Sequence, residues 1–275
     1  MIDEVMAYLS SQGYVDPSSS TFADNTYTKR LGFIIRRREV DREIVQARHY
    51  VTFVACPSIL TGELIDTSKD ELWNWLEPNS RRYQPDQGGI FLPLDKRTTL
   101  EGIVLEEERY RIGVTRTEFI ERFLRINRNG YIELGCNLAD QREDDIAFAF
   151  VHMIGLFWQF LGFVTDLYKL EGVHMPFKVM LNMKGTESTL LYHLGEGWPG
   201  PYERMSSYRP TCLETNIQIL EELRSASIDE GNISEIVKRV ATRVDNAWGE
   251  RVPRCYNNAT HDPDKQFPIS KMRRY

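Results

Sequence analysis

The chain has 275 residues, a formal net charge of −6, 41% apolar residues and 27% charged residues. This composition is typical of a globular protein and excludes one that is basic over its whole surface, while leaving room for a local basic patch. The length allows one large domain or two small ones. We expect an N-terminal α+β subdomain over residues 1–95 and a C-terminal α+β domain over residues 96–275.

The cysteines and the N-terminal residues bear on compartment and metal binding. The sequence MIDEVMAYLSSQGY lacks the basic start and apolar run of a signal peptide. The cysteines show neither a C-x-x-C pair nor a zinc-binding pattern, and they are Cys56, Cys136, Cys212 and Cys255. Reduced and mostly buried thiols are the simplest interpretation. The sequence therefore predicts a cytoplasmic protein without a metal or a cofactor.

The first part of the chain predicts a helix followed by two strands. Residues 2–12 have the apolar spacing of a short helix, whereas residues 31–35 and 49–55 are rich in Ile, Val, Phe and Tyr. A basic cluster lies between the two strands, and its candidate residues for nucleic-acid binding are Arg36, Arg37 and Arg38.

A second helix is predicted from its N-terminal signal. Ser68 and Glu71 have the spacing of a capping box, and Pro78 is expected to end the helix. Residues 84–99 then mark the expected boundary between the two units.

A hairpin is predicted in the middle of the chain. Asn129-Gly130 separates the two expected strands, residues 122–128 and 131–136, and such a dipeptide favours a two-residue turn. In this register Ile126 would face Glu133 across the two strands. The residues just before the hairpin have helical spacing, so we expect an irregular or helical start near Thr117.

The run IAFAFVHMIGLFWQFLGFV, residues 146–164, contains no charge. Small and polar residues recur in and around it at spacings of three, four and seven, namely Asp145, His152, Gly155, Gln159, Gly162, Asp166 and Lys169. At 3.6 residues per turn these positions share one stripe, which favours a buried helix with a polar seam over a membrane span. We expect this helix to run from Asp144 to Leu170.

The C-terminal part predicts further strands and a last helix. Residues 177–184 alternate as in a half-buried strand, residues 213–220 form another strand, and a helix begins at Asn232 and ends at Gly249. The fold class predicted is α+β, with a mostly antiparallel sheet packed around one long, largely buried central helix and with the smaller N-terminal α+β subdomain.

One family resemblance rests on the middle of the chain. The run RINRNGYIELGC, the helix FVHMIGLFWQFLGFVTDLY and the strand FKVMLNMKG resemble the region that follows the AlbA/Schlafen-like domain in bacterial nucleic-acid-binding proteins. The resemblance implies a prokaryotic accessory region that binds nucleic acid. The Glu-Phe-Lys strand motif of the family's conserved domain is not found, so no catalytic residue is carried over.

Arginine density supplies the main candidate site. Six arginines lie between residues 109 and 128, namely Arg109, Arg111, Arg116, Arg122, Arg125 and Arg128. Guanidinium groups bind phosphates in pairs of hydrogen bonds, and neighbouring tyrosines can stack on bases. The alternative is a solvated sheet face on which glutamates pair with the arginines.

The seam of the central helix is a second candidate. His152 and Gln159 lie two turns apart, and a neutral histidine there could take part in acid–base chemistry. The alternative is a histidine satisfied within the core, with Gly155 and Gly162 letting a neighbouring element approach closely.

These patterns lead to one functional hypothesis and two alternatives. The first is a non-catalytic binding or accessory subunit of a prokaryotic nucleic-acid-acting system, for example in antiviral defence. Its partners would be DNA or RNA and a protein encoded nearby, an ATPase or a nuclease, with no membrane involved. The alternatives are a pure protein–protein interaction subunit, using aromatics such as Trp73, Trp75 or Trp198, and a nuclease-like enzyme with an unrecognised site.

Overall fold

The computed structural model describes residues 49–58, 62–82, 95–110, 118–136, 138–142, 145–174, 176–192, 211–223 and 230–249. The helix predicted over residues 2–12, the strand predicted over 31–35 and the cluster Arg36, Arg37 and Arg38 lie outside the described residues.

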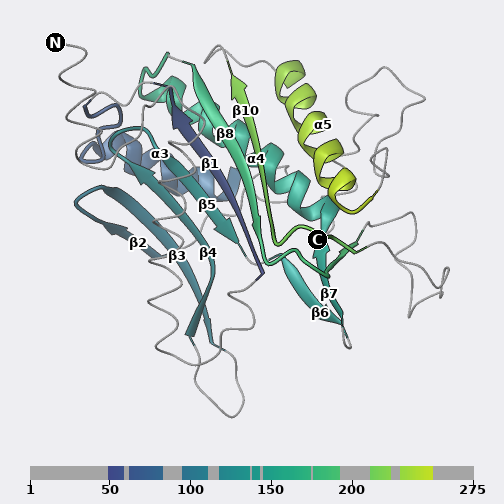
Figure 1. The fold of residues 1–275 in the computed structure, drawn as a ribbon. Helices are drawn as coiled ribbons and strands as arrows, with labels where there is room; N and C mark the ends of the chain where they lie inside the picture. Colours follow the sequence, from purple (N-terminus) through teal and green to yellow (C-terminus); the bar gives the residue numbers. More distant parts are fainter. Residues whose placement is uncertain are drawn as a thin grey trace, which may run out of the picture.

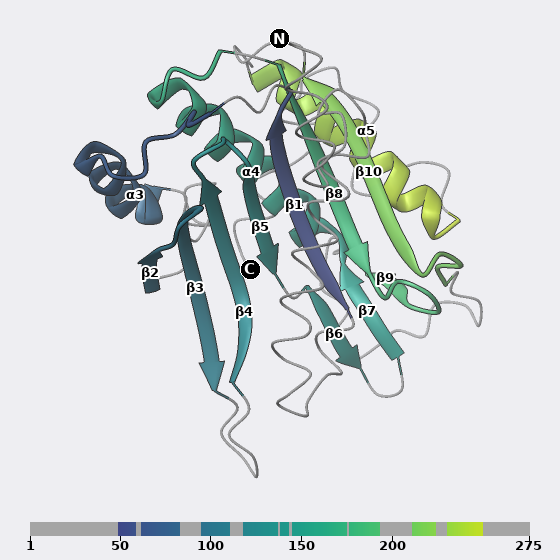
Figure 2. The same ribbon diagram turned by 60° about the vertical axis from the view of Figure 1, so that its left-hand side comes forward.

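A seven-stranded sheet forms the centre of the fold (Figures 1 and 2). Its strand order is β10-β8-β1-β5-β4-β3-β2, and every neighbouring pair is antiparallel. The strands are β1 Tyr50–Pro57, β2 Asp95–Thr98, β3 Gly102–Tyr110, β4 Glu118–Asn127, β5 Ile132–Cys136, β8 Phe177–Lys184 and β10 Asn216–Leu223.

The helices of the described residues pack on one face of this sheet (Figure 1). They are α3 Asp70–Arg82, α4 Phe150–Leu170 and α5 Glu230–Ala247. Alternate strand residues and the apolar sides of all three helices form one buried cluster. Phe53 of β1, for example, lies against Phe157 and Phe160 of α4, at ring-centroid distances of 5.6 and 5.9 Å. Apolar residues recur at every second position on the strands and about every 3.6 positions on the helices. The core forms where these two apolar faces pack together.

A small second sheet leads into α4. It contains β6 Ala139–Arg142, β7 Asp145–Ala149 and β9 Leu190–Tyr192, with β7 antiparallel to β6 and parallel to β9. The chain passes directly from β7 into α4 at Phe150.

The predicted arrangement of a sheet around one long central helix is wrong. The sheet is the central element, and α4 shares one of its faces with α3 and α5. The predicted helix also started too early, because residues 145–149 form β7. A continuous apolar run suits a buried strand as well as a buried helix, so it does not show where one ends and the other begins.

Strand β1 belongs to residues 1–95, for which a separate N-terminal subdomain is predicted. This strand pairs with β5 on one side and with β8 on the other. It therefore lies near the middle of the seven-stranded sheet. Strand pairing over long sequence separations is invisible to local patterns, which is why the sequence did not reveal it.

The second face of the sheet is buried as well around β1, β5 and β8. Its buried residues there are Tyr50, Thr52, Val54, Cys56, Tyr131, Glu133, Met180 and Asn182. Strand β8 has the predicted bounds, but it is buried on both faces rather than on one. The last helix has its predicted apolar face, with Ile233, Val240 and Val244 buried.

The β4–β5 hairpin has a different register from the one predicted. Ile126 lies opposite Ile132, and Arg125 lies opposite Glu133. The backbone N–H of Asn127 donates to the carbonyl of Tyr131 (2.8 Å), so the loop has three residues and Gly130 takes a φ of +82°. A three-residue loop with a left-handed glycine is the common alternative to the two-residue Asn-Gly turn. The stretch from Glu118, expected to be helical or irregular, belongs to β4.

The start of α3 also differs from its prediction. The Ser68 hydroxyl donates to Oδ1 of Asp66 (2.6 Å), so it does not act as a capping box, and the helix runs past Pro78 to Arg82. Within the described part of the chain, no helix is both long enough and apolar enough to cross a membrane.

Candidate functional site

A two-stranded ribbon projects from the sheet at one end of β3 and β4 (Figure 2). Among the described residues, β2 pairs with β3 as far as Glu106, and β5 pairs with β4 as far as Arg122. Beyond these residues β3 and β4 pair with each other as far as Tyr110 and Glu118, with a bulge between Glu107 and Glu108. Among the described residues no further strand flanks this ribbon.

The ribbon holds part of the predicted arginine cluster. Arg109 lies opposite Phe119 near the far end of the ribbon, and Arg122 lies opposite Glu107 at its base. Arg111 and Arg116 are outside the described residues, in the sequence 111–117 that connects β3 with β4.

Arg125 belongs to the second face of the sheet instead. Its guanidinium carbon lies 5.4 Å from the ring centre of Phe123, which stacks on Tyr50 at 6.2 Å with an interplanar angle of 7°. The Phe123 ring covers Gly135, where an added Cβ would lie 2.2 Å from a ring carbon. Arg125 therefore packs as part of an aromatic stack, and this role is structural.

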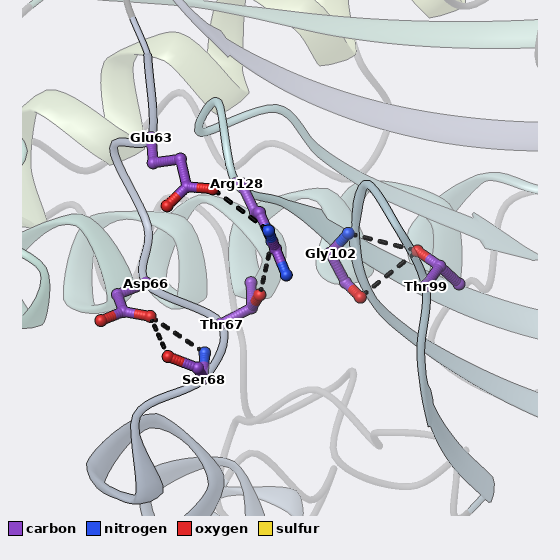
Figure 3. A network of polar contacts seen from close by, with 7 residues as sticks. All are labelled: Glu63, Asp66, Thr67, Ser68, Thr99, Gly102 and Arg128. Atoms are coloured by element: carbon purple, nitrogen blue, oxygen red, sulfur yellow. Dashed lines mark hydrogen bonds and ion pairs between the residues drawn. The ribbon is translucent and has the colours of Figure 1, made fainter.

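Arg128 is held in a polar network at the opposite end of the sheet from the ribbon (Figure 3). Its Nε donates to Oγ1 of Thr67 (3.1 Å) and its Nη1 donates to Oε1 of Glu63 (3.1 Å). The described members of the arginine cluster thus lie apart, with Arg109 and Arg122 on the ribbon and Arg128 at the opposite end of the sheet. A phosphate at Arg128 would have to compete with the carboxylate of Glu63.

The same end of the sheet is joined by backbone hydrogen bonds. The N–H groups of Leu64 and Ile65 both donate to the carbonyl of Arg128, at 2.7 and 2.9 Å. The N–H of Arg128 donates in turn to the carbonyl of Glu101 (2.8 Å). Three loops far apart in sequence are therefore fixed to one another.

Side-chain contacts strengthen this junction. Oε2 of Glu171, after α4, accepts from Nζ of Lys69 and from the N–H of Asp66, both at 3.3 Å. Hydrogen bonds from the hydroxyl and the N–H of Ser68 lower the pKa of Asp66 below its ordinary value. The two hydrogen bonds fix the turn from Asp66 to Ser68 just before α3.

The helix seam lies on the outer side of α4. His152 and Gln159 are both partly exposed, whereas Phe157, Phe160 and Leu161 are buried. A Cβ built at Gly162 would meet no atom within 4 Å, so no neighbouring element approaches closely there. Gly155 of the same stripe is buried, so the outward side of the helix contains most of the predicted seam but not all of it.

Two buried polar residues were not singled out from the sequence. Glu133 is fully buried on the second face, and Asn182 is 1% exposed with no hydrogen-bond partner for its amide oxygen or nitrogen. The alternation in FKVMLNMKG places Asn182 on the second face, but nothing in the sequence shows that this face is buried. Among the described residues, no group of three or more His, Cys, Asp and Glu side chains is arranged to hold a metal ion.

The described residues thus define an α+β protein with one large antiparallel sheet, helices on one face, and a projecting ribbon. Comparison with protein-family models, curated proteins and solved structures finds no match for the chain.

Proposed function

We propose that this protein is a non-catalytic binding subunit of a nucleic-acid-acting system, and that the β3–β4 ribbon contacts DNA or RNA. The observation that carries the proposal is the ribbon itself, which extends past the described parts of both flanking strands. A two-stranded β-ribbon fits the major groove of a duplex, and arginine binds phosphates there.

The order of charged residues along the ribbon supports contact with nucleic acid. Its base contains Glu107 and Glu108. The nine residues from Arg109 to Thr117 contain three arginines and no acidic residue. Along the sequence, a stretch of positive charge therefore follows the acidic base of the ribbon, and a local basic stretch can bind a phosphate backbone although the whole chain is acidic.

The proposal is tested by titrating a short labelled DNA duplex and a single-stranded RNA at several salt concentrations. Binding should weaken steeply with salt, because phosphate contacts release counterions. Arg109→Gln should weaken binding and lower the salt slope by about 1, as expected for one lost phosphate contact. The matched control is Lys169→Gln, which removes an exposed positive charge from the last turn of α4, far from the ribbon along the chain and in a different element.

Arg125 and Arg128 are unsuitable for this test, because both are held in the fold and their loss would disturb it. If the wild-type protein binds neither nucleic acid, or if Arg109→Gln and Lys169→Gln behave alike, the ribbon is not a nucleic-acid arm. Metal-dependent cleavage of either substrate would favour the nuclease-like alternative. Assignment to prokaryotic antiviral defence rests on the family resemblance and is tested by the function of the adjacent genes.

A further inference from the structure

Three loops at the end of the sheet opposite the ribbon form a single platform. We define the platform as residues 62–69, 99–102 and 127–131. The backbone bonds from Leu64 and Ile65 to Arg128, and from Arg128 to Glu101, connect the three loops. Figure 3 shows the side chains of Glu63 and Thr67 meeting Arg128 beside the turn of Thr99 and Gly102.

The platform holds one leucine out in solvent. Leu100, at the tip of the β2–β3 turn, is 97% exposed. Two hydrogen bonds close the turn beneath it: the N–H of Thr99 donates to the carbonyl of Gly102 (2.7 Å), and the N–H of Gly102 donates to the hydroxyl oxygen of Thr99 (3.2 Å). Nothing in the turn requires an apolar side chain at this position, which polar residues ordinarily occupy.

The conformation of this turn is also fixed by steric fit. Gly102 has a φ of +155°, and a Cβ there would lie 2.0 Å from the carbonyl oxygen of Ile126. The close approach holds the β2–β3 turn against β4. A side chain presented on a rigid turn loses little conformational entropy on binding, which favours its use as an anchor.

Charge distinguishes among possible occupants. The platform and the first turn of α3 contain five acidic residues, namely Glu63, Asp66, Asp70, Glu71 and Glu101, against Lys69 and Arg128. Both cations are engaged, Lys69 with Glu171 (3.3 Å) and Arg128 with Glu63 (3.1 Å). These acidic surroundings disfavour the binding of nucleic acid and of a second copy of the same platform, because like charges repel.

We infer that the platform docks a partner protein that has an apolar pocket for Leu100 and a basic rim around it. This surface lies at the opposite end of the sheet from the ribbon, and the inference does not depend on nucleic-acid binding by the ribbon. An accessory subunit could then hold nucleic acid at one end and its partner protein at the other.

The test places a photo-crosslinking residue, benzoylphenylalanine, at position 100 of the full chain in the cells that produce it. The matched control has the same residue at position 213, since Leu213 is 87% exposed and precedes β10 at the other end of the sheet. The protein that crosslinks is identified, produced separately and titrated against the wild type, Leu100→Ser and Leu213→Ser.

The inference predicts a crosslink from position 100 but not from position 213. Leu100→Ser should weaken binding of the identified partner by about ten-fold or more, Leu213→Ser should leave it unchanged, and added salt should weaken it. A crosslink between two copies of this chain would overturn the inference, and so would the absence of a crosslink or equal effects of the two serine variants. Because both leucines are exposed, neither serine variant removes buried packing.

Discussion

The hydroxyl of Tyr168 near the end of α4 donates a hydrogen bond of 2.7 Å to the carbonyl of Gly130 in the β4–β5 turn. Tyr168 is fully buried, and its ring meets Phe177 edge to face at 5.1 Å. Burial raises the pKa of Tyr168 well above its ordinary value, so the hydroxyl remains a donor. This contact joins the helix layer to the turn that carries Arg128.

Tyr168→Phe should destabilise the protein by about 1–2 kcal/mol, because a buried carbonyl loses its donor while the ring packing is kept. Urea denaturation followed by far-UV circular dichroism measures the change. Tyr168→Leu should cost more, since it also loses the contact with Phe177. A Phe variant as stable as the wild type would show that the hydrogen bond contributes nothing.

Gly130 allows a second test of the same turn. Its φ is +82°, and an added Cβ would lie 2.7 Å from Cγ of Pro57. Gly130→Ala should destabilise by about 1–2 kcal/mol from the left-handed backbone alone, with a further loss from the clash. Gly62→Ala is the matched control, because Gly62 has a φ of +68° and nothing within 4 Å of an added Cβ. Equal free energies of unfolding for the two variants would mean that Pro57 moves away freely.

Local patterns in the sequence predicted several elements well. The bounds of β8 and the apolar face of α5 follow from period-2 alternation and 3.6-residue spacing, which depend on near neighbours in the chain. The split between β7 and α4 was missed because apolar residues run through both. Helix α3 continues past Pro78, so the helical preference of the surrounding residues outweighs the helix-breaking effect of one proline.

The candidate site was harder to predict, because it depends on register and on long-range pairing. A shift of one residue in the β4–β5 hairpin moves every side chain to the other face, and it places Arg125 rather than Ile126 opposite Glu133. The cluster of arginines looked continuous in sequence, yet Arg109 lies on the ribbon and Arg128 at the other end of the sheet. The ribbon projects because the described parts of the neighbouring strands end before it does. No local pattern in the sequence shows where those neighbouring strands end.

The two sides of α4 should respond differently to substitution. Phe157 and Leu161 are fully buried against the sheet, whereas Gln159 is partly exposed. Phe157→Asp or Leu161→Asp should abolish soluble folding, since burying a carboxylate without a partner costs several kcal/mol. Gln159→Ala should leave the thermal midpoint nearly unchanged. If Gln159→Ala instead keeps the stability of the wild type but loses binding in either assay, the seam is a binding site.

Cys56 gives a prediction about reactivity. It is 2% exposed, its Sγ lies 3.6 Å from the carbonyl oxygen of Pro57, and burial raises its pKa to about 12. Because the thiolate is the reactive form, iodoacetamide at pH 8 should label Cys56 only after unfolding. Labelling in the native protein, located by peptide mass spectrometry, would show that β1 opens.

The same pKa predicts a stability change at alkaline pH. The folded state holds the Cys56 proton more tightly than the unfolded chain, so this thiol's contribution is complete below the ordinary pKa of 9.0 and is lost as the pH rises towards about 12. Tyr168 has a raised pKa as well and acts in the same direction. The thiol is therefore isolated by comparing the wild type with Cys56→Ala in urea unfolding between pH 8 and pH 10.5. The wild type should lose more stability over this range than the variant, and parallel curves would show that Cys56 does not titrate differently in the two states.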